Sequence, residues 1–413
     1  MIIPSIDLQD GNAVQLIGGE EKALDAGDPR PLAELYGRVG DIAVIDLDKA
    51  LGTGDNAATV RDLVRMTPCR VGGGIRDIET AIAWLDAGAT KIILGTAAKP
   101  EILKQLPPER VIVALDARHG EVVVEGWQKS TGRGVIERID ELKGLADNFM
   151  VTFVEREGRL GGTDLEFAKQ IKEAAGKAGV TIAGGVTSPE EIASLDQIGC
   201  DAQIGMALYT GRLGLAEAFA APLKTDRPDR LWPTVVTDER GVALGLCYSD
   251  MESLKTALER GIGVYHSRSR GLWIKGESSG ATQDLIHVAV DCDRDCLRFT
   301  VRQANPGFCH LSTRTCWGED QGLSQLIRRL EQRRLAAPAG SYTARLFNDS
   351  QLLGAKLCEE ADELAAASDR DHVIHETADV LFFTLTTLAA HGIGLDEVEA
   401  VLDQRALKVT RRD

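Results

Sequence analysis

Four of the eight cysteines lie within one short segment of the sequence, at positions 292, 296, 309 and 316. In a chain that starts without a secretion signal, clustered cysteines are typical of metal binding rather than of disulfides. Thiolates are preferred zinc ligands, and three protein ligands leave a fourth position for water, as in catalytic zinc sites. The spacing predicts a catalytic zinc site at Cys292, Cys309 and Cys316, with Cys296 as an alternative fourth ligand.

Three aspartates surround the first of these cysteines. In a strand, Asp291, Asp293 and Asp295 would project to one face and Cys292 to the other. Carboxylates gathered in this way are destabilising unless a hard cation neutralises them, which predicts Mg²⁺. A basic, hydroxyl-rich segment precedes them and is expected to bind an anion. Its binding residues are Ser267, Arg268, Ser269, Arg270 and Lys275.

A second group of carboxylates lies near the end of the sequence. Glu359, Glu360 and Glu363 are spaced to share one face of a helix. Glu376 and Asp379 stand at the head of the next helix, directly before an apolar stretch that would draw them inward. Like charges brought together on packed helices predict a second Mg²⁺ site.

The first 220 residues repeat themselves. Eight β-branched runs alternate with amphipathic stretches, which predicts a (β/α)8 barrel. Asp7 ends the first run, and the equivalent Asp116 ends the fifth, about 110 residues later. Because active sites lie at the strand C-termini, this pair could act as general acid and base. Glycines repeat with the same offset and could bind a phosphate at each end of a substrate: Gly73, Gly74 and Gly95, then Gly184, Gly185 and Gly205.

The overall composition excludes several classes of protein. The formal net charge is −16 and the pI is near 5.0, which argues against a nucleic-acid or anionic-membrane binder. No apolar run reaches the roughly 18 residues of a membrane span, and the first residues lack a basic leader. We expect a cytoplasmic protein that has no membrane and no nucleic-acid partner.

Residues 1–222 resemble the histidine-biosynthesis barrel that isomerises the formimino ribotide, through PSIDLQDGNAVQL, VGGGIRD and ALDARHGEVVVEGW. The resemblance implies an Amadori rearrangement with Asp7 as base and Asp116 as acid. It adds Arg76 and Thr152 to the substrate-binding residues. The sequence departs from the family pattern at Glu157, Arg159 and Ala183, and it lacks the arginine that is common near Gln15.

Residues 228–322 resemble phosphoribosyl-AMP cyclohydrolase, through SRSRGLWIKGESSGATQ and GFCHLSTRTCW. The resemblance implies that a zinc-activated water attacks C6 of the adenine ring, with His310 carrying the proton. It also implies a homodimer, because zinc ligands in this family come from two subunits. Residues 323–413 resemble phosphoribosyl-ATP pyrophosphohydrolase, through GSYTARLF and ETADVLFF. That resemblance implies Mg²⁺ on the diphosphate, with Arg345 and Lys356 stabilising the leaving pyrophosphate.

The three resemblances fall on consecutive reactions of one pathway. The expected architecture is multidomain: a TIM barrel, a small mixed α+β zinc domain and an all-α domain. The leading interpretation is a trifunctional enzyme that acts on phosphoribosyl-ATP, phosphoribosyl-AMP and the formimino ribotide, with dimer contacts through the cyclohydrolase and helical domains. Two alternatives stay open: a bifunctional enzyme whose barrel is an inactive scaffold, and a barrel that senses a ribotide.

Overall fold

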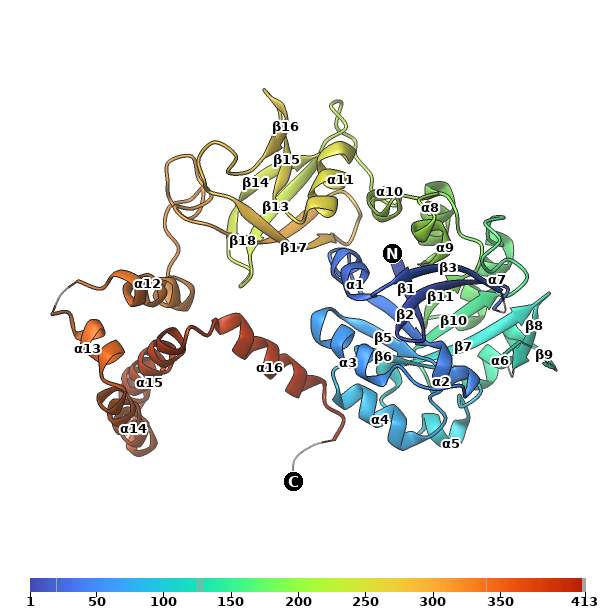
Figure 1. The fold of residues 1–413 in the computed structure, drawn as a ribbon, viewed down its shortest axis with the longest axis horizontal. Coiled ribbons are helices and arrows are strands. Elements are labelled where there is room, and N and C mark those ends of the chain that lie inside the picture. Colours follow the sequence, from blue (N-terminus) through green and yellow to red (C-terminus); the bar gives the residue numbers. More distant parts are fainter. Residues whose placement is uncertain (20, 125, 128, 339, 411–413) are drawn as a thin grey trace. The chain divides into compact units, whose positions relative to one another are not determined.

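The computed structural model describes residues 1–410 apart from positions 20, 125, 128 and 339 (Figure 1). Its contacts divide the chain into two units. The first comprises Met1–Val236, Leu246–Asn305 and Gln404–Asp413, and the second comprises Thr237–Gly245 and Pro306–Asp403. The three domain boundaries expected from the sequence remain predictions.

Eight parallel strands form a closed barrel in the first unit, as the sequence predicts. The ring closes because β12 pairs with β1 and β10 pairs with β7. Short apolar runs form these strands because both faces are buried, and Ile3, Ala43, Ile93 and Met150 pack inside the ring. The strands are β1 Ile2–Gln9, β4 Ile42–Asp46, β5 Cys69–Gly72, β6 Lys91–Leu94, β7 Val111–Arg118, β10 Asn148–Phe153, β11 Gly179–Ala183 and β12 Cys200–Ile204.

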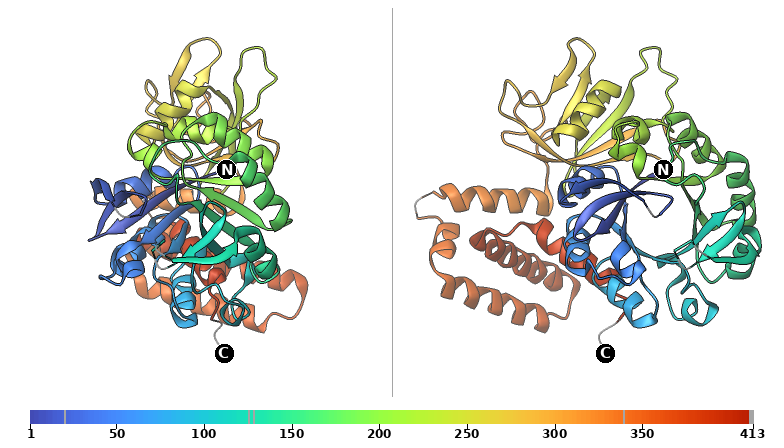
Figure 2. Two further views of the ribbon diagram at one scale, coloured as in Figure 1. Left: turned by 90° about the vertical axis from the view of Figure 1, so that its right-hand side faces the viewer. Right: turned by 45° about the vertical axis from the view of Figure 1, so that its right-hand side comes forward.

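Helices surround the ring and cover its outer face (Figure 2). Their apolar stripes point inward; α3, for example, buries Val60 and Leu63. The helices are α1 Arg30–Gly37, α2 Leu47–Leu51, α3 Ala57–Met66, α4 Ile78–Asp86, α5 Pro100–Leu103, α6 Val135–Leu142, α7 Leu165–Ala175, α8 Pro189–Ile198, α9 Met206–Tyr209 and α10 Leu215–Ala220, with a 3-10 turn at Pro108–Arg110.

Two antiparallel hairpins extend the internal repeat beyond what the sequence predicts. Strands β2 Asn12–Ile17 and β3 Glu21–Gly27 follow β1, and β2 pairs with it. Strands β8 Glu121–Val124 and β9 Lys129–Gly134 follow β7 in the same way. Each half of the barrel therefore begins with an aspartate-bearing strand and then a hairpin.

The middle of the chain forms a four-stranded antiparallel sheet and one helix. The strand order is β14–β13–β18–β17, with Tyr265 and Phe299 among the fully buried side chains. The expected strand–turn–strand–helix sequence after residue 230 is present. The elements are β13 Trp232–Asp238, β14 Ala243–Ser249, α11 Met251–Arg260, β15 Val264–Ser267, β16 Gly271–Ile274, β17 Gln283–Val290 and β18 Leu297–Gln303.

The last part of the chain is helical, as expected. Ile327, Leu330, Leu385 and Ala389 form part of its core. Among the described residues, α15 alone is long and apolar enough to cross a membrane, which is weak evidence for a span because core helices pass the same test. The helices are α12 Gly322–Ala336, α13 Tyr342–Asn348, α14 Ser350–Ala366, α15 Arg370–His391 and α16 Leu395–Leu407.

Candidate functional sites

Two aspartates occupy equivalent places near the C-terminal ends of barrel strands β1 and β7. Burial raises the pKa of Asp7 to about 7 and also raises the pKa of Asp116. Hydrogen bonds from Trp127 and Thr152 to the Asp116 carboxyl act in the opposite direction. Thr152 is the register partner of Asp116 on strand β10, which explains the contact. A carboxyl group with a pKa near neutrality, as burial gives Asp7, is suited to general acid–base chemistry.

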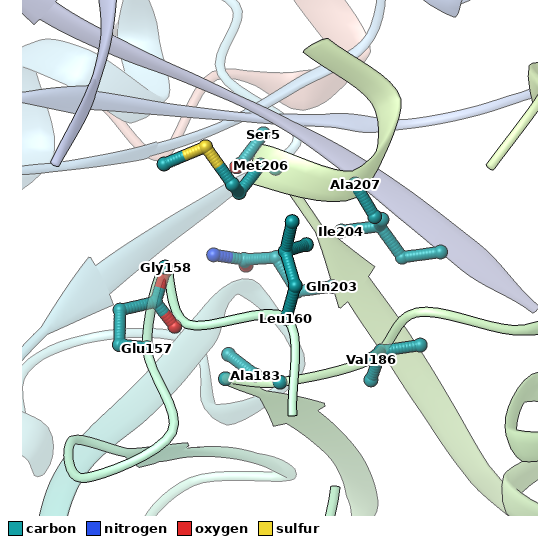
Figure 3. A pocket seen from close by; sticks show the side chains of 13 residues that line it. Ser5, Glu157, Gly158, Leu160, Ala183, Val186, Gln203, Ile204, Met206 and Ala207 are labelled. Carbon is teal, nitrogen blue, oxygen red and sulfur yellow. The ribbon is translucent and has the colours of Figure 1, made fainter. Parts of the chain in front are cut away.

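A third carboxyl group joins them. Burial, followed by the charges of Asp7 and Asp116, raises the pKa of Glu157 to about 8. Its carboxylate lines a cavity of about 20 Å³ together with Ser5 and Gln203 (Figure 3). The sequence identifies Glu157 as a departure from the family pattern but does not predict three acidic groups within reach of one another.

The paired glycines sit where the backbone leaves no room for a side chain. Gly73 and Gly184 both have positive φ, and added Cβ atoms would lie 2.2 Å from Asp46 O and 2.6 Å from Phe153 O. Gly74 and Gly185 are equally constrained, with 2.3 Å approaches to Lys49 Cγ and Gly162 O, respectively. These two tight turns at equivalent positions suit close approach of backbone N–H groups to phosphate.

The other barrel residues that were predicted to bind substrate differ in their surroundings. A Cβ on Gly205 would meet the Gln15 amide at 2.5 Å, whereas one on Gly95 would meet no described atom within 4 Å. The Arg76 guanidinium donates to Ala50 O over 2.9 Å, so it is held against the C-terminal end of α2. A phosphate contact by Arg76 remains a prediction.

The basic segment forms the turn of the β15–β16 hairpin, where Ser267 Oγ and Ser269 Oγ are 3.4 Å apart. The Arg268 guanidinium lies 5.2 Å from the centre of the Tyr248 ring, and that of Arg270 lies 5.4 Å from the Trp273 ring. The buried Lys275 approaches the same Trp273 ring at 5.9 Å. Cation–π contacts therefore hold three cations around the hairpin.

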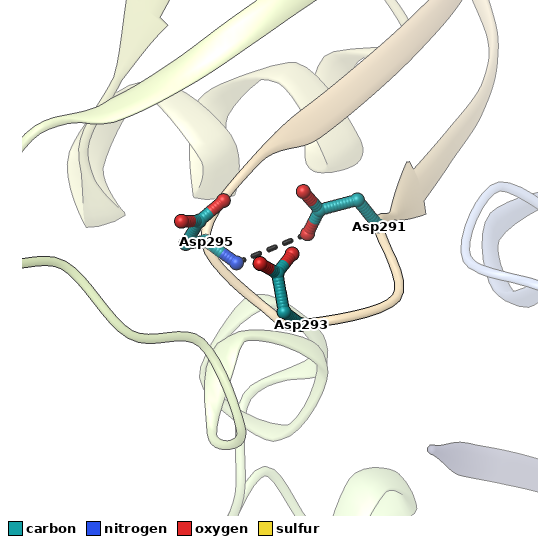
Figure 4. Close-up of side chains that lie close together, drawn as sticks. All are labelled: Asp291, Asp293 and Asp295. Atoms are coloured by element: carbon teal, nitrogen blue, oxygen red, sulfur yellow. Dashed lines mark hydrogen bonds between the residues drawn. The ribbon is translucent and has the colours of Figure 1, made fainter.

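The three aspartates do not lie in a strand, so that expectation is wrong. They lie in the turn between β17 and β18, where the Asp291 carboxylate accepts the N–H group of Asp295 at 3.0 Å (Figure 4). The same carboxylate accepts the N–H group of Cys296 at 3.1 Å. Such short polar side chains stabilise turns in preference to strands. One oxygen each from Asp291, Asp293 and Asp295 nevertheless lies within 4.8 Å of the others. The charge of Asp293 raises the pKa of Asp295, a repulsion that a bound cation would relieve.

The zinc candidates divide between the two units. In the second unit, the Leu311 N–H, then the Thr313 hydroxyl and the Cys316 thiol, lower the pKa of Cys309. This environment favours the thiolate that zinc requires. His310 is exposed, and its Nδ1 lies 3.8 Å from Cys309 Sγ.

The other two cysteines belong to the first unit. Cys292 is exposed in the turn that also carries the three aspartates. Burial and the charge of Asp291 raise the pKa of Cys296, which disfavours its thiolate. These properties favour Cys292 over Cys296 as a ligand.

The carboxylates of the helical part converge between α14 and α15. One oxygen each from Glu360, Glu363 and Glu376 lies within 4.8 Å of the others. Burial and then the charges of Asp379 and Glu363 raise the pKa of Glu360, so Asp379 belongs to the same cluster.

The other predicted residues of this site lie around the cluster. Glu359 is instead paired with Lys356 at 2.8 Å, and Arg345 is exposed on α13. Sequence analysis missed His372, whose Nε2 lies 3.3 Å from Glu376 Oε1; its i−4 spacing from Glu376 was the available signal.

Comparison with known protein families follows the same order along the chain. Residues 1–214 match the family described as histidine biosynthesis protein. Residues 245–318 match phosphoribosyl-AMP cyclohydrolase, and residues 323–406 match phosphoribosyl-ATP pyrophosphohydrolase. The chain belongs to the histidine-biosynthesis family. It is a multifunctional enzyme in which isomerase-type, cyclohydrolase and pyrophosphohydrolase domains follow one another.

Individual relatives in this family cover different parts of the chain. Histidine biosynthesis bifunctional protein his7 of Schizosaccharomyces pombe is 38% identical over 81% of this chain and 79% of its own length. A histidine biosynthesis trifunctional protein of Komagataella pastoris is 49% identical over 48% of this chain, which spans only 24% of that relative. An imidazole-4-carboxamide isomerase of Gemmatimonas aurantiaca is 38% identical over 53% of this chain and 99% of its own length.

Proposed function

We propose that the chain catalyses three consecutive steps of histidine biosynthesis. The helical domain removes pyrophosphate from phosphoribosyl-ATP, the middle domain opens the adenine ring of phosphoribosyl-AMP, and the barrel isomerises the formimino ribotide. The observation that carries this proposal is that each of the three family matches coincides with its own cluster of chemically suitable residues. We place the enzyme in the cytoplasm, where these intermediates would be made and consumed.

The pyrophosphohydrolase step is assigned to the helical carboxylate cluster. Glu360, Glu363, Glu376 and Asp379 would hold Mg²⁺, since three oxygens already lie within 4.8 Å and repel one another. Magnesium bound there neutralises diphosphate charge and orients water. Lys356 and Arg345 approach the leaving pyrophosphate, and Glu359 keeps Lys356 oriented through their ion pair.

The cyclohydrolase step is assigned to the thiols. Cys292, Cys309 and Cys316 would hold zinc, and the lowered pKa of Cys309 fits that role. Zinc bound there lowers the pKa of a water molecule to about 7. His310, exposed beside Cys309, moves the proton between the water and the ring nitrogen. The Arg268–Lys275 hairpin binds the substrate phosphate, and Asp291, Asp293 and Asp295 hold Mg²⁺ nearby in the same turn as Cys292.

The isomerase step is assigned to the barrel. Asp7 takes a proton from C2 of the aminoaldose, and Asp116 protonates the ring oxygen as the ring opens. Burial raises the pKa of Asp116, which favours the protonated form that this acid requires. The turns at Gly73–Gly74 and Gly184–Gly185 bind the two phosphates, and Thr152 holds Asp116 in place.

We place these activities in a homodimer formed through the cyclohydrolase and helical domains. Exposed large apolar side chains support the proposal, because monomeric proteins rarely expose many of them on neighbouring segments. They include Leu311 and Trp317 beside the zinc thiols, at 70% and 71% exposure, and Val373, Ile374 and Leu381 on α15. Zinc ligands drawn from two subunits would make the dimer a condition of ring opening.

A second candidate function is a bifunctional enzyme whose barrel does not turn over. One relative that aligns over 81% of this chain is named a bifunctional protein, and another that aligns over 82% of it is named a trifunctional protein. Glu157 places a third carboxyl group against the catalytic pair. Such a barrel could still bind a ribotide through its glycine turns and act as a sensor.

Product formation from the isolated ribotide separates these functions. We expect the purified chain to convert the formimino ribotide into the aminoketose, and Asp7→Asn and Asp116→Asn to abolish this conversion while leaving both hydrolase activities intact. No turnover by the wild-type chain contradicts the trifunctional proposal. Tight ribotide binding without turnover identifies the sensor.

Elemental analysis tests the metal assignment of the middle domain. We expect about one zinc per chain and the loss of both zinc and ring opening in Cys309→Ser. Pyrophosphohydrolase activity should persist in that variant, and an equal loss of both activities would show that the two hydrolase sites are not separate.

A further inference from the structure

The loop that carries Cys309 and Cys316 is joined to strand β13 by a buried ion pair. Arg314 Nη2 donates to Asp238 Oδ2 over 3.1 Å, and the two side chains are 5% and 0% exposed. Arg314 lies between the two cysteines, whereas Asp238 precedes it by 76 residues and ends β13. The ion pair therefore links the thiol loop to a distant segment of the second unit.

Hydrogen bonds to one oxygen of the Asp238 carboxylate fix the orientation of the other, which faces Arg314. Asp238 Oδ1 accepts the N–H groups of Arg240 at 3.1 Å and Val242 at 2.9 Å, in the turn between β13 and β14. The carboxylate cannot rotate without breaking these bonds. Oδ2 is consequently held toward Arg314 by the sheet itself.

The loop that carries the two thiols, residues 308–316, is held by hydrogen bonds and close contacts on both sides of Arg314. The two sides of the loop are joined by hydrogen bonds from Phe308 N to Arg314 O and from Cys309 N to Thr313 O, at 3.1 and 3.2 Å. Cys316 N donates to Leu244 O over 2.8 Å. A Cβ on Gly245 would lie 2.9 Å from Cys316 Sγ, so only glycine lets this thiol approach β14 so closely.

We infer that Asp238 is a positioning residue for the zinc site and acts through Arg314 on the two thiols of this loop. The inference rests on the proposed cyclohydrolase function, and Asp238 itself lies outside the matched residues 245–318. A buried ion pair carries a large desolvation cost and is not needed for stability as such. Groups behind the direct ligands orient those ligands, and their loss typically lowers metal affinity by about ten- to a hundredfold.

The test measures zinc binding rather than catalysis. Asp238→Asn keeps an oxygen for the β13–β14 turn but removes the charge opposite Arg314. We expect chelator competition to show a zinc Kd raised about ten- to a hundredfold, and the absorption bands of the Co²⁺-loaded protein to shift. Pyrophosphohydrolase activity should stay at the wild-type level. Arg314→Lys, which retains the charge, should bind zinc more tightly than Arg314→Gln.

Asp320→Asn is the matched control. It removes another buried carboxylate of the same unit, one that pairs with Arg328 on α12 and lies outside the segment between the two thiols. Its zinc Kd should match the wild type. If the two residues act as one unit, the double variant Asp238→Asn with Arg314→Gln should bind zinc about as tightly as the single variant with the larger loss of affinity.

The outcomes separate this inference from the proposed function. An unchanged zinc Kd in Asp238→Asn, or in Arg314→Gln if the former does not fold, overturns the inference. Additive losses in the double variant overturn it as well. If the wild-type chain takes up no zinc, or Cys309→Ser takes up as much as the wild type, the proposed cyclohydrolase site fails instead.

Discussion

The Thr152 hydroxyl hydrogen-bonds the carboxyl group of Asp116, its register partner on the neighbouring strand of the barrel. The bond favours the ionised form and so opposes the effect of burial on the pKa of Asp116. Thr152→Val removes the bond, so the pKa should rise further. We expect the basic limb of the isomerase kcat profile, which follows loss of the acid's proton, to move to higher pH.

Thr181→Val is the control for this change. Thr181 is equally buried on β11, but its hydroxyl is a hydrogen-bond partner of Arg70 rather than of a carboxyl group. A basic limb that stays in place in Thr152→Val, whatever the loss of rate, would contradict a role for Asp116 as the acid.

Glu157 should make the stability of the barrel depend on pH. Its pKa is raised from 4.5 to about 8, so between these values the folded chain retains a proton that the unfolded chain releases. The free energy of unfolding therefore falls as pH rises through this window and is level above it. Glu157→Gln removes this dependence. The free energy of unfolding of the variant, relative to that of the wild type, should therefore rise by roughly 1–3 kcal/mol when the pH is raised from 5 to 8.5.

Urea unfolding at the two pH values measures this difference. The exposed Glu166→Gln on α7 is the control and should follow the wild type at both. Parallel behaviour of Glu157→Gln and the wild type would show that the carboxyl group at position 157 ionises normally.

The two kinds of glycine in the barrel should respond differently to alanine. Gly73→Ala places a methyl group against Asp46 O at a positive φ, which should cost about 2 kcal/mol or more. Gly95→Ala adds its methyl group in a space that is free of described atoms, and its unfolding midpoint should lie close to the wild-type value. Equal midpoints for the two variants would mean that the Gly73 turn can relax.

The helical carboxylates can be ranked by Mg²⁺ titration. Glu376→Gln removes the charge of one of the three converging carboxylates, so we expect the Mg²⁺ concentration for half-maximal pyrophosphohydrolase activity to rise about tenfold or more. Glu359→Gln should leave it nearly unchanged, because Glu359 pairs with Lys356 instead. The opposite ranking would move the metal to the exposed side of α14.

The barrel could be predicted from the sequence because its strands are buried on both faces. Each strand appears in the sequence as a short β-branched run, and the Asp and Gly positions recur at a constant offset. The two hairpins could not be predicted in this way, since β3 and β9 are largely exposed and carry no apolar alternation. The turn at Asp291 could not be predicted for a related reason. Alternating acidic residues fit a strand as well as a turn, and only the hydrogen bonds from Asp295 and Cys296 to Asp291 distinguish the two.

Contacts between segments that are far apart in the sequence could not be predicted from it. The pairing of Asp238 with Arg314 and the convergence of Glu376 with Glu360 depend on how elements pack, and no local pattern encodes them. Spacing identified which residues could bind metal, but not which of them face one another.

The two hairpins that follow β1 and β7 meet each other. The indole ring of Trp127, between β8 and β9, packs onto the backbone of Gly19, between β2 and β3, at a distance that excludes any side chain there. The same indole bonds the Asp116 carboxyl group. Trp127 therefore connects both duplicated hairpins to the candidate acid, so a side chain introduced at Gly19 would displace the same indole that bonds Asp116.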